Sequence, residues 1–345
     1  MTSTGARPQQ EPYIVPCAVI FLIAFAIRLA YAYARPIPVS ADAAYYLMVA
    51  ENLHHGRGFV ADYVWHYLAG IPDGLPVPSN SYWMPGTSLV TAGAFAIARD
   101  TSLRVAQYPS LIFGALLCAI AAWIAGALTR RREAALLAGA AAAVSYYLVQ
   151  LSLFPDHFML NAVLVNLSLL ALWAAWRERA SLALLAGALA ALAYLTRTDG
   201  AILAFVALCL AIASRRRVRK SRPIEIVVYF LIAFSLVSLP WWTRQTLVFG
   251  HPSGAGALRT AFLTNYDDLF RVDHSHLTLH DYLQTSQVVA TGMKAYAFYR
   301  SLRILARALM LFSALAVAAL WLRDLRREAV PWLAYLPLAL IISCF

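Results

Sequence analysis

The fold of this chain is decided by residues 13–34, which read YIVPCAVIFLIAFAIRLAYAYA. A helix needs about 20 predominantly apolar residues to cross a bilayer, and this run is long enough. It is too long for the apolar region of a cleavable signal peptide, and no clear small-residue cleavage site accompanies it. We therefore predict that residues 13–34 form a membrane anchor that stays on the protein.

The composition of the whole chain agrees with a membrane protein. Of the 345 residues, 61% are hydrophobic and 13% are charged, whereas a soluble domain carries about 25% charged residues. The net charge of +11 comes from basic residues that cluster between apolar runs. This pattern is typical of cytoplasmic loops under the positive-inside rule. We therefore predict an integral membrane protein and no nucleic-acid partner.

Further apolar runs predict an all-α polytopic protein, a single module covering residues 1–345. About nine spans are predicted, at residues 13–34, 107–128, 134–153, 158–176, 181–196, 200–214, 224–247, 303–322 and 330–345. Another apolar stretch, 86–98, is short for a span. We predict that it is a re-entrant or surface-lying segment, because every arginine-rich loop then falls on one side of the membrane, with a cytoplasmic N-terminus.

This topology leaves two long exterior loops, residues 36–106 and 249–300, and places the polar chemistry outside. All eight histidines fall in exterior segments, whereas the cytoplasmic loops hold arginine. An active site would therefore face the exterior. Alanine is abundant, and arginine is far more frequent than lysine. This bias indicates a bacterial source, so we predict a location in the bacterial plasma membrane.

Asp42 is the leading candidate for chemistry, because it stands where the chain first leaves the bilayer. It opens a short amphipathic helix for which Ser40 is a good N-cap and Gly56 a suitable stop. Tyr45 and Tyr46 begin the apolar face of this helix. The alternative interpretation is that Asp42 only complements the positive end of the helix dipole.

Three more segments bring polar residues to the exterior face. Asp156 and His157 form a turn between two spans, where they suit an acid/base or ligand pair or are simply solvated. Arg197 and Asp199 interrupt an apolar run, and Arg244 ends another span beside two tryptophans. A guanidinium binds phosphate bidentately, so both arginines are candidate anion ligands. An Arg-Asp structural pair and an aromatic belt are the alternatives.

A weaker cluster lies in the second exterior loop. His274, His276 and His280 have a spacing that can hold zinc, and aspartates nearby can hold a harder cation. They match no recognised motif, and an ordinary polar loop is the alternative. The sequence thus suggests a divalent cation as a candidate cofactor but requires none.

Outward-facing carboxylates and arginines together suggest transfer from a lipid-phosphate donor. A carboxylate can accept the proton of a hydroxyl group, and arginines can stabilise a phosphate leaving group as charge develops on it. Hydrolysis of a glycosidic bond normally needs two flanking carboxylates. Transfer from a sugar phosphate needs less acid assistance, because phosphate leaves without being protonated.

Four segments also resemble the motifs of one family, in the family's order. They are Asp42-Ala43-Ala44-Tyr45-Tyr46 with Ala50-Glu51-Asn52-Leu53, then Tyr82-Trp83-Met84-Pro85-Gly86, then residues 187–200, and Pro240-Trp241-Trp242-Thr243-Arg244-Gln245 with Phe249-Gly250-His251-Pro252. Their order and spacing, over residues 13–255, resemble the GT-C superfamily of membrane glycosyltransferases. The closest likeness is to the branch of protein O-mannosyltransferases and lipid A aminoarabinose transferases.

The resemblance implies an inverting glycosyltransferase with a GT-C-like fold. It would move a sugar from a polyprenyl-phosphate donor to the hydroxyl of a glycan, lipid or protein acceptor on the exterior face. Asp42 would be the catalytic base with Asp156 assisting, and Arg197 and Arg244 would bind the donor phosphate. The expected supporting residues are Tyr45, Tyr46, Glu51, His157 and Asp199.

The sequence departs from the family pattern at several points. Ala43 stands where the family often has a second acid, Thr198 replaces a proline, and residues 82–86 lack the acid–lysine pair of the aminoarabinose branch. The chain ends at Phe345 inside an apolar run, so we expect either a short member or a missing C-terminal part. Two other functions stay open: a lipid-linked sugar transporter or flippase, and a non-catalytic subunit of an envelope glycan assembly complex.

Overall fold

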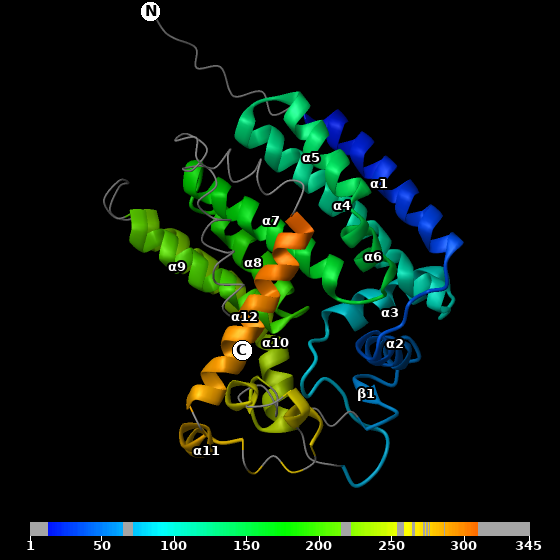
Figure 1. The fold of residues 1–345 in the computed structure, drawn as a ribbon, viewed down its shortest axis with the longest axis vertical. Coiled ribbons are helices and arrows are strands. Elements are labelled where there is room, and N and C mark those ends of the chain that lie inside the picture. The colour runs from blue at the N-terminus through cyan, green and yellow to red at the C-terminus, as the bar shows by residue number, and fades with distance from the viewer. Residues whose placement is uncertain are drawn as a thin grey trace, which may run out of the picture.

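The computed structural model describes residues 13–64, 72–214, 222–253, 259–263, 266–271, 273, 275, 277–285 and 287–309. These residues are mostly helical, and the long helices pack side by side (Figure 1). Loops and short elements, including α2 and β1, gather at one end of the bundle (Figure 1). The sequence-predicted all-α membrane architecture is therefore confirmed.

Four helices of the described part are long and apolar enough to cross a membrane. They are α1 (Ile14–Ala34), α4 (Leu103–Thr129), α7 (Phe158–Arg177) and α10 (Arg222–Phe249). The predicted span 134–153 is instead a broken pair, α5 (Arg132–Val144) and α6 (Tyr146–Leu153), bent by 55°. Counting this pair as one span gives five over the described residues, not the nine predicted for the whole chain. The predicted span 330–345 lies outside them.

The other elements are shorter or belong to the loops. The helices are α2 (Ala41–His54), α3 (Gly86–Ala98), α8 (Leu182–Tyr194), α9 (Ile202–Ser214), α11 (Leu279–Gln284) and α12 (Gln287–Leu309). The 3-10 helices are η2 (Thr198–Ala201), η3 (Arg259–Phe262) and η4 (Tyr266–Phe270). β1 (Val60–Ala61) pairs antiparallel with β2 (Val77–Pro78).

Three of these elements bear on the predicted topology. α3 is a short apolar helix, as predicted for residues 86–98. The predicted spans 181–196 and 200–214 are also short, with α8 and α9 of 13 residues each. Helix α12 begins at Gln287, inside the segment predicted as an exterior loop.

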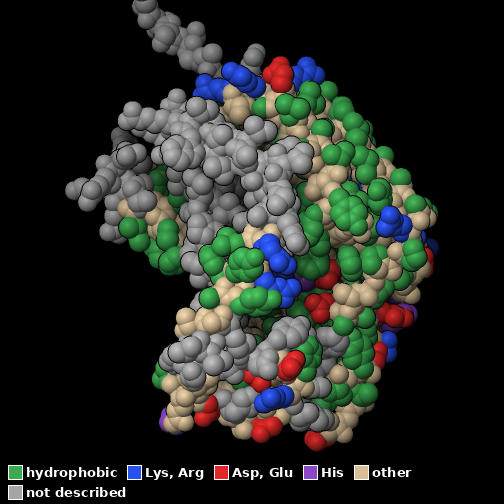
Figure 2. All heavy atoms as spheres, viewed as in Figure 1, with side chains coloured by type: hydrophobic (Ala, Val, Ile, Leu, Met, Phe, Trp, Pro, Cys, Tyr) green, Lys and Arg blue, Asp and Glu red, His purple; other side chains and the backbone are tan. Residues whose placement is uncertain are grey.

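Two hydrophobic clusters form the interior of the bundle. One joins α7, α8, α9 and α10, and the other joins α1, α4 and α5. Helices α4 and α7 contact each other and so connect the two halves. The outer faces stay apolar: Leu22 of α1 and Leu236 of α10 are each 63% exposed, and hydrophobic side chains cover much of the face seen in Figure 2. The protein is therefore a multi-pass membrane protein.

A buried arginine holds the first half of the bundle together. The Arg28 side chain, on α1, is 0% exposed. It donates hydrogen bonds to Ser152 Oγ at 3.0 Å and to the Ala24 carbonyl at 3.1 Å, and lies 3.3 Å from Cys118 Sγ. It also reaches the Ala143 carbonyl at 3.5 Å, one of the carbonyls left open where α5 ends. Arg28 thus joins α1 to α4 and to the break between α5 and α6.

Gly187 permits the close packing of α8 against α10. A Cβ atom at this position would overlap the Phe230 carbonyl oxygen, and no side-chain rotation relieves a contact with backbone. We expect Gly187→Ala to destabilise the fold by about 1–3 kcal/mol, as overpacking does, which a lower melting temperature in detergent would report. Gly93→Ala is the matched control, because a Cβ there meets nothing within 4 Å. Equal melting temperatures for the two variants would contradict the packing.

Candidate functional site

The start of α2 forms one wall of the candidate site. Ser40 Oγ accepts a hydrogen bond from the Ala43 backbone N–H at 3.1 Å, so Ser40 is the predicted N-cap. Gly56 follows the helix with a φ of +74°, a conformation that glycine adopts without strain. Asp42 lies in the first turn, where the helix dipole favours a negative charge.

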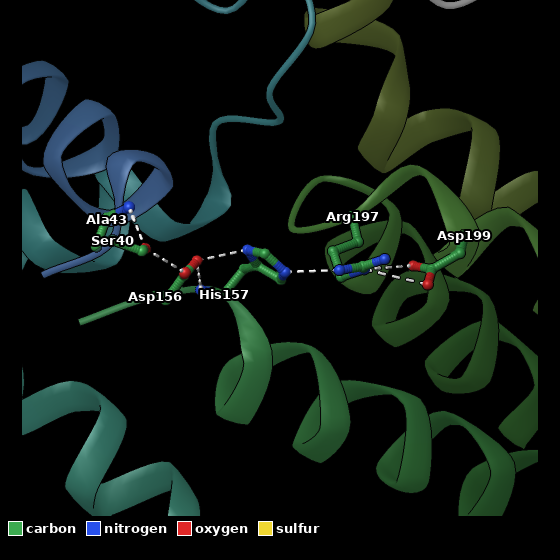
Figure 3. A network of polar contacts seen from close by, with 6 residues as sticks. All are labelled: Ser40, Ala43, Asp156, His157, Arg197 and Asp199. Atoms are coloured by element: carbon green, nitrogen blue, oxygen red, sulfur yellow. Dashed lines mark hydrogen bonds and ion pairs between the residues drawn. The ribbon is translucent and has the colours of Figure 1, made fainter. Parts of the chain in front are cut away.

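Asp156 and His157 lie next to the start of α2, in the turn between α6 and α7. They are 5% and 3% exposed, so the turn is buried rather than solvated. Asp156 Oδ1 accepts the His157 backbone N–H at 2.6 Å, and Ser40 Oγ donates to Oδ2 at 3.4 Å (Figure 3). Burial alone would raise the pKa of Asp156, but the contacts with His157 and Ser40 outweigh it and hold this pKa below its usual value.

The two ring nitrogens of His157 face opposite charges. Nδ1 lies 2.6 Å from Asp156 Oδ1 at a bent angle, and Nε2 lies 2.6 Å from Arg197 Nη1 (Figure 3). A guanidinium only donates hydrogen bonds, so Nε2 accepts. The imidazole is then neutral, with its proton on Nδ1 beside the Asp156 carboxylate. The two neighbours together fix this tautomer.

The Arg197 guanidinium contacts Asp199 and His157 on two sides, through Nε and Nη1. Its Nε donates to Asp199 Oδ1 at 3.2 Å and Oδ2 at 3.1 Å, while Nη1 donates to His157. The side chain is 41% exposed, and Nη2 has no protein partner within the described part of the chain. A guanidinium fixed in this way is preorganised to bind an anion. It stands at the break between α8 and η2, in extended backbone.

Asp42 belongs to the same electrostatic group. Its side chain is half-buried, and none of the described residues donates a hydrogen bond to its carboxylate. Burial raises the pKa of Asp42 and the charge of Asp156 raises it further, while the positive charge of Arg197 acts in the opposite direction. A carboxylate with a raised pKa is a better base at neutral pH.

Arg244 is placed differently from Arg197. Its guanidinium lies over three rings, those of Phe59, Trp241 and Phe249, at 5.4, 5.0 and 5.3 Å. It donates to the Phe59 carbonyl at 3.3 Å and to Gln245 Oε1 at 3.1 Å, and Gln245 in turn donates to the Asn80 carbonyl at 2.7 Å. These contacts attach Phe59 and Asn80 to α10. The structure thus brings together Asp42, Asp156, His157 and Arg197, and sets Arg244 among aromatic rings.

Of the predicted supporting residues on α2, Tyr46 contacts His157, whereas Tyr45 and Glu51 lie elsewhere. The ring of Tyr46 packs edge-on against His157 at 5.8 Å, and burial, with help from Asp156 and Asp42, raises its pKa well above the usual value. Tyr45 is 3% exposed and its hydroxyl accepts the Asn80 backbone N–H; burial raises its pKa to about 12. Glu51 is exposed near the other end of α2 and makes no contact with the group.

The described residues contain only part of the predicted histidine cluster. His274 and His276 lie outside them, and His280 Nε2 lies 2.8 Å from the Gln284 side chain. The ranges that the structure covers contain no group of three or more His, Cys, Asp or Glu side chains able to hold a metal. Within the site, Asp156 and Arg197 occupy both ring nitrogens of His157, and the Arg197 charge already faces the carboxylates.

Fold and site together define a class: an α-helical multi-pass membrane protein with carboxylates and a preorganised arginine at one end of the bundle. Residues 81–241 match the model of the dolichyl-phosphate-mannose-protein mannosyltransferase family. A sequence comparison with curated proteins found no match. The sequence-predicted resemblance to GT-C membrane glycosyltransferases is therefore confirmed by a family match over this part of the chain.

Solved structures with a similar fold come from the oligosaccharyltransferase of Archaeoglobus fulgidus. The complex with Zn and sulfate has a TM-score of 0.56 at 15% identity, over 95% of this chain and 48% of that one. The complex with an inhibitory peptide and a dolichol-phosphate has a TM-score of 0.56 at 15% identity, over 96% and 36%. The apo form has a TM-score of 0.55 at 15% identity, over 98% and 50%. This chain thus spans half or less of their length, and the likeness is one of fold.

Proposed function

We propose that this protein is a glycosyltransferase that takes a sugar from a polyprenyl-phosphate donor and transfers it to an acceptor hydroxyl. One observation carries the proposal: Asp42, a half-buried carboxylate with a raised pKa, shares a polar group with an arginine that is clamped and still has free donors. The matching family model, described by a dolichyl-phosphate sugar, supports the class of donor. So does the fold shared with a protein solved with dolichol-phosphate.

The reaction uses these groups in distinct roles. Asp42 accepts the proton of the acceptor hydroxyl, whose oxygen forms a bond to the anomeric carbon as the bond from that carbon to the phosphate oxygen breaks. The electron pair leaves with the phosphate, and Arg197 stabilises the charge that develops there. Attack opposite the leaving group inverts the anomeric configuration.

The remaining residues position this pair. Asp156 is buried and already accepts hydrogen bonds, so it serves by holding His157, which in turn holds the Arg197 guanidinium. Asp199 holds the same guanidinium from its Nε edge. Arg244 donates a hydrogen bond to Phe59 and lies among aromatic rings, which leaves Arg197 as the phosphate ligand that the geometry favours.

We place the reaction on the exterior face of the bacterial plasma membrane, with the N-terminus in the cytoplasm. The arginine cluster 130–132 follows the C-terminal end of α4, whereas Asp156 of the candidate site lies near the N-terminal end of α4, in a recess shared with Ala106 and Ser110. The positive-inside rule then puts the cluster in the cytoplasm and the site outside. The acceptor is a hydroxyl of a glycan, lipid or protein.

The proposal is tested by incubating membranes that contain the protein with radiolabelled polyprenyl-phosphate sugars and following label into acceptor. We expect transfer that depends on the protein and inverts the anomeric configuration. A panel of polyprenyl-pyrophosphate and nucleotide sugars tests the donor class, and use of these instead of the monophosphate would contradict it. Movement of intact labelled donor across vesicle membranes, without transfer, would favour the transporter alternative.

A further inference from the structure

A small recess lies behind Asp156, between α3 and α4. Its volume is about 250 Å³, including open solvent at its mouth, and it has room for about one water molecule. Three hydroxyl-bearing residues, Thr87, Thr91 and Ser110, line it together with the Asp156 carboxylate. The rest of its wall is apolar. The recess thus places three hydroxyl groups and a carboxylate among apolar side chains.

Two of the hydroxyls have no partner among the described residues. Thr87 and Ser110 are each 4% exposed, and Thr87 Oγ1 and Ser110 Oγ are buried without a hydrogen bond. Buried polar groups are normally paired with protein or ordered water, so two orphaned hydroxyls in one cavity indicate an occupant. The Val105 carbonyl also lacks its usual helical donor, because Pro109, one turn later, has no backbone N–H.

One oxygen of the Asp156 carboxylate, Oδ2, has few hydrogen-bond donors. An ionised carboxylate has about four acceptor sites, and at 5% exposure Asp156 gains little from solvent. Oδ1 has the His157 backbone N–H and Nδ1. Oδ2 has only Ser40 Oγ at 3.4 Å, which is long for a hydrogen bond between oxygens. A further donor to Oδ2 would stabilise the ionised form.

We propose that the recess binds a water molecule that connects Thr87 Oγ1 and Ser110 Oγ to the carboxylate of Asp156. Such a water has the two to four polar partners that buried waters require. It keeps Asp156 ionised, so that the carboxylate holds the His157 tautomer and His157 holds Arg197. Thr87 and Ser110 are then positioning residues for an arginine on another helix. Their effect on transfer rests on the proposed function, whereas the water site does not.

The test uses the pH dependence of stability, which needs no donor. The pKa of Asp156 lies below its ordinary value, so its ionised form stabilises the fold at neutral pH, and this contribution is lost as the pH falls through the folded-state pKa. The ionisable groups coupled to Asp156 are Asp42 and Tyr46 on α2, His157 beside it and Arg197 before η2. The residues of α3 and α4 that line the recess carry no ionisable side chain.

Thr87→Val keeps the shape of the side chain and removes a partner of the water, which raises the pKa of Asp156. We expect the acid-side fall in melting temperature of the full chain in detergent to move up by about 0.5–1 pH unit, the shift that losing one hydrogen bond produces. Ser110→Ala should move it in the same direction. In an Asp156→Asn background neither substitution should move it.

Thr246→Val on α10 is the matched control, because its hydroxyl donates only to the Trp242 carbonyl of its own helix. It should change the melting temperature equally at every pH. The proposal is overturned if Thr87→Val and Ser110→Ala keep the wild-type acid transition, or if their shift persists in Asp156→Asn. Failure of the transfer assay would leave this measurement unaffected, so the two proposals can fail separately.

Discussion

Asp42→Asn is expected to lower the rate of sugar transfer by about 10²–10⁴-fold, the usual contribution of a general base. The amide keeps the size of the side chain and cannot accept the hydroxyl proton. The measurement is initial transfer rate from polyprenyl-phosphate sugar at saturating acceptor. Asp62→Asn is the control, because that carboxylate pairs with Arg57 at the surface, where ion pairs contribute little. Turnover like that of the wild type in Asp42→Asn would end the base assignment.

Folding is expected to survive this substitution. Burial and the nearby Asp156 charge both raise the pKa of Asp42, which means that the folded protein disfavours its ionised form. A neutral amide therefore relieves repulsion in the site, and the melting temperature at neutral pH should be equal to that of the wild type or higher. Lost activity together with a clearly lower melting temperature would attribute the effect to folding instead.

Arg197→Ala is expected to weaken donor binding by about 10- to 100-fold, because hydrogen bonds to charged groups are worth about 1.5–3 kcal/mol. The rate at saturating donor should fall as well, since charge grows on the phosphate during transfer. Arg197→Lys should recover little, because an ammonium cannot contact His157, Asp199 and a phosphate with one planar fork. Titration of the apparent donor affinity measures the effect.

Arg57→Ala is the control for the loss of positive charge, because Arg57 is half-exposed and pairs with Asp62 away from the site. Its donor affinity should match that of the wild type. An unchanged affinity in Arg197→Ala would contradict the role of Arg197. Equal losses in the two variants would indicate general electrostatic attraction rather than a bound phosphate.

The elements around Asp42 were predictable because their signals are local. The Ser40 cap, the apolar face of α2 and the Gly56 stop each depend on neighbours within a few residues. The break at Arg197 was predictable as well, because charged residues interrupt the apolar run there, and α8 and α9 are short on either side of it. Hydropathy could not show the bend at Ser145 between α5 and α6, because neither proline nor glycine marks it.

The residues of the site were predictable from the sequence, but the contacts between them were not. Asp156 and His157 were expected in a turn that could equally be solvated, and the structure buries them against α2. Arg197 reaches His157 because α7 and α8 run antiparallel, which returns the chain to the same end of the bundle after 40 residues. The rings around Arg244 include Phe59 from a distant segment, a contact that depends on tertiary packing.

Arg28 has a consequence for how the protein is made. Helix α1 is synthesised before its partners, since Cys118 and Ser152, which contact Arg28, follow 90 and 124 residues later. An unpaired arginine at the centre of a membrane helix opposes insertion by about 2.5–3.5 kcal/mol, and α1 must tolerate part of this penalty until α4 to α6 arrive. Stable insertion of α1 therefore depends on the later helices α4 to α6. The helices of this half of the bundle insert cooperatively rather than independently.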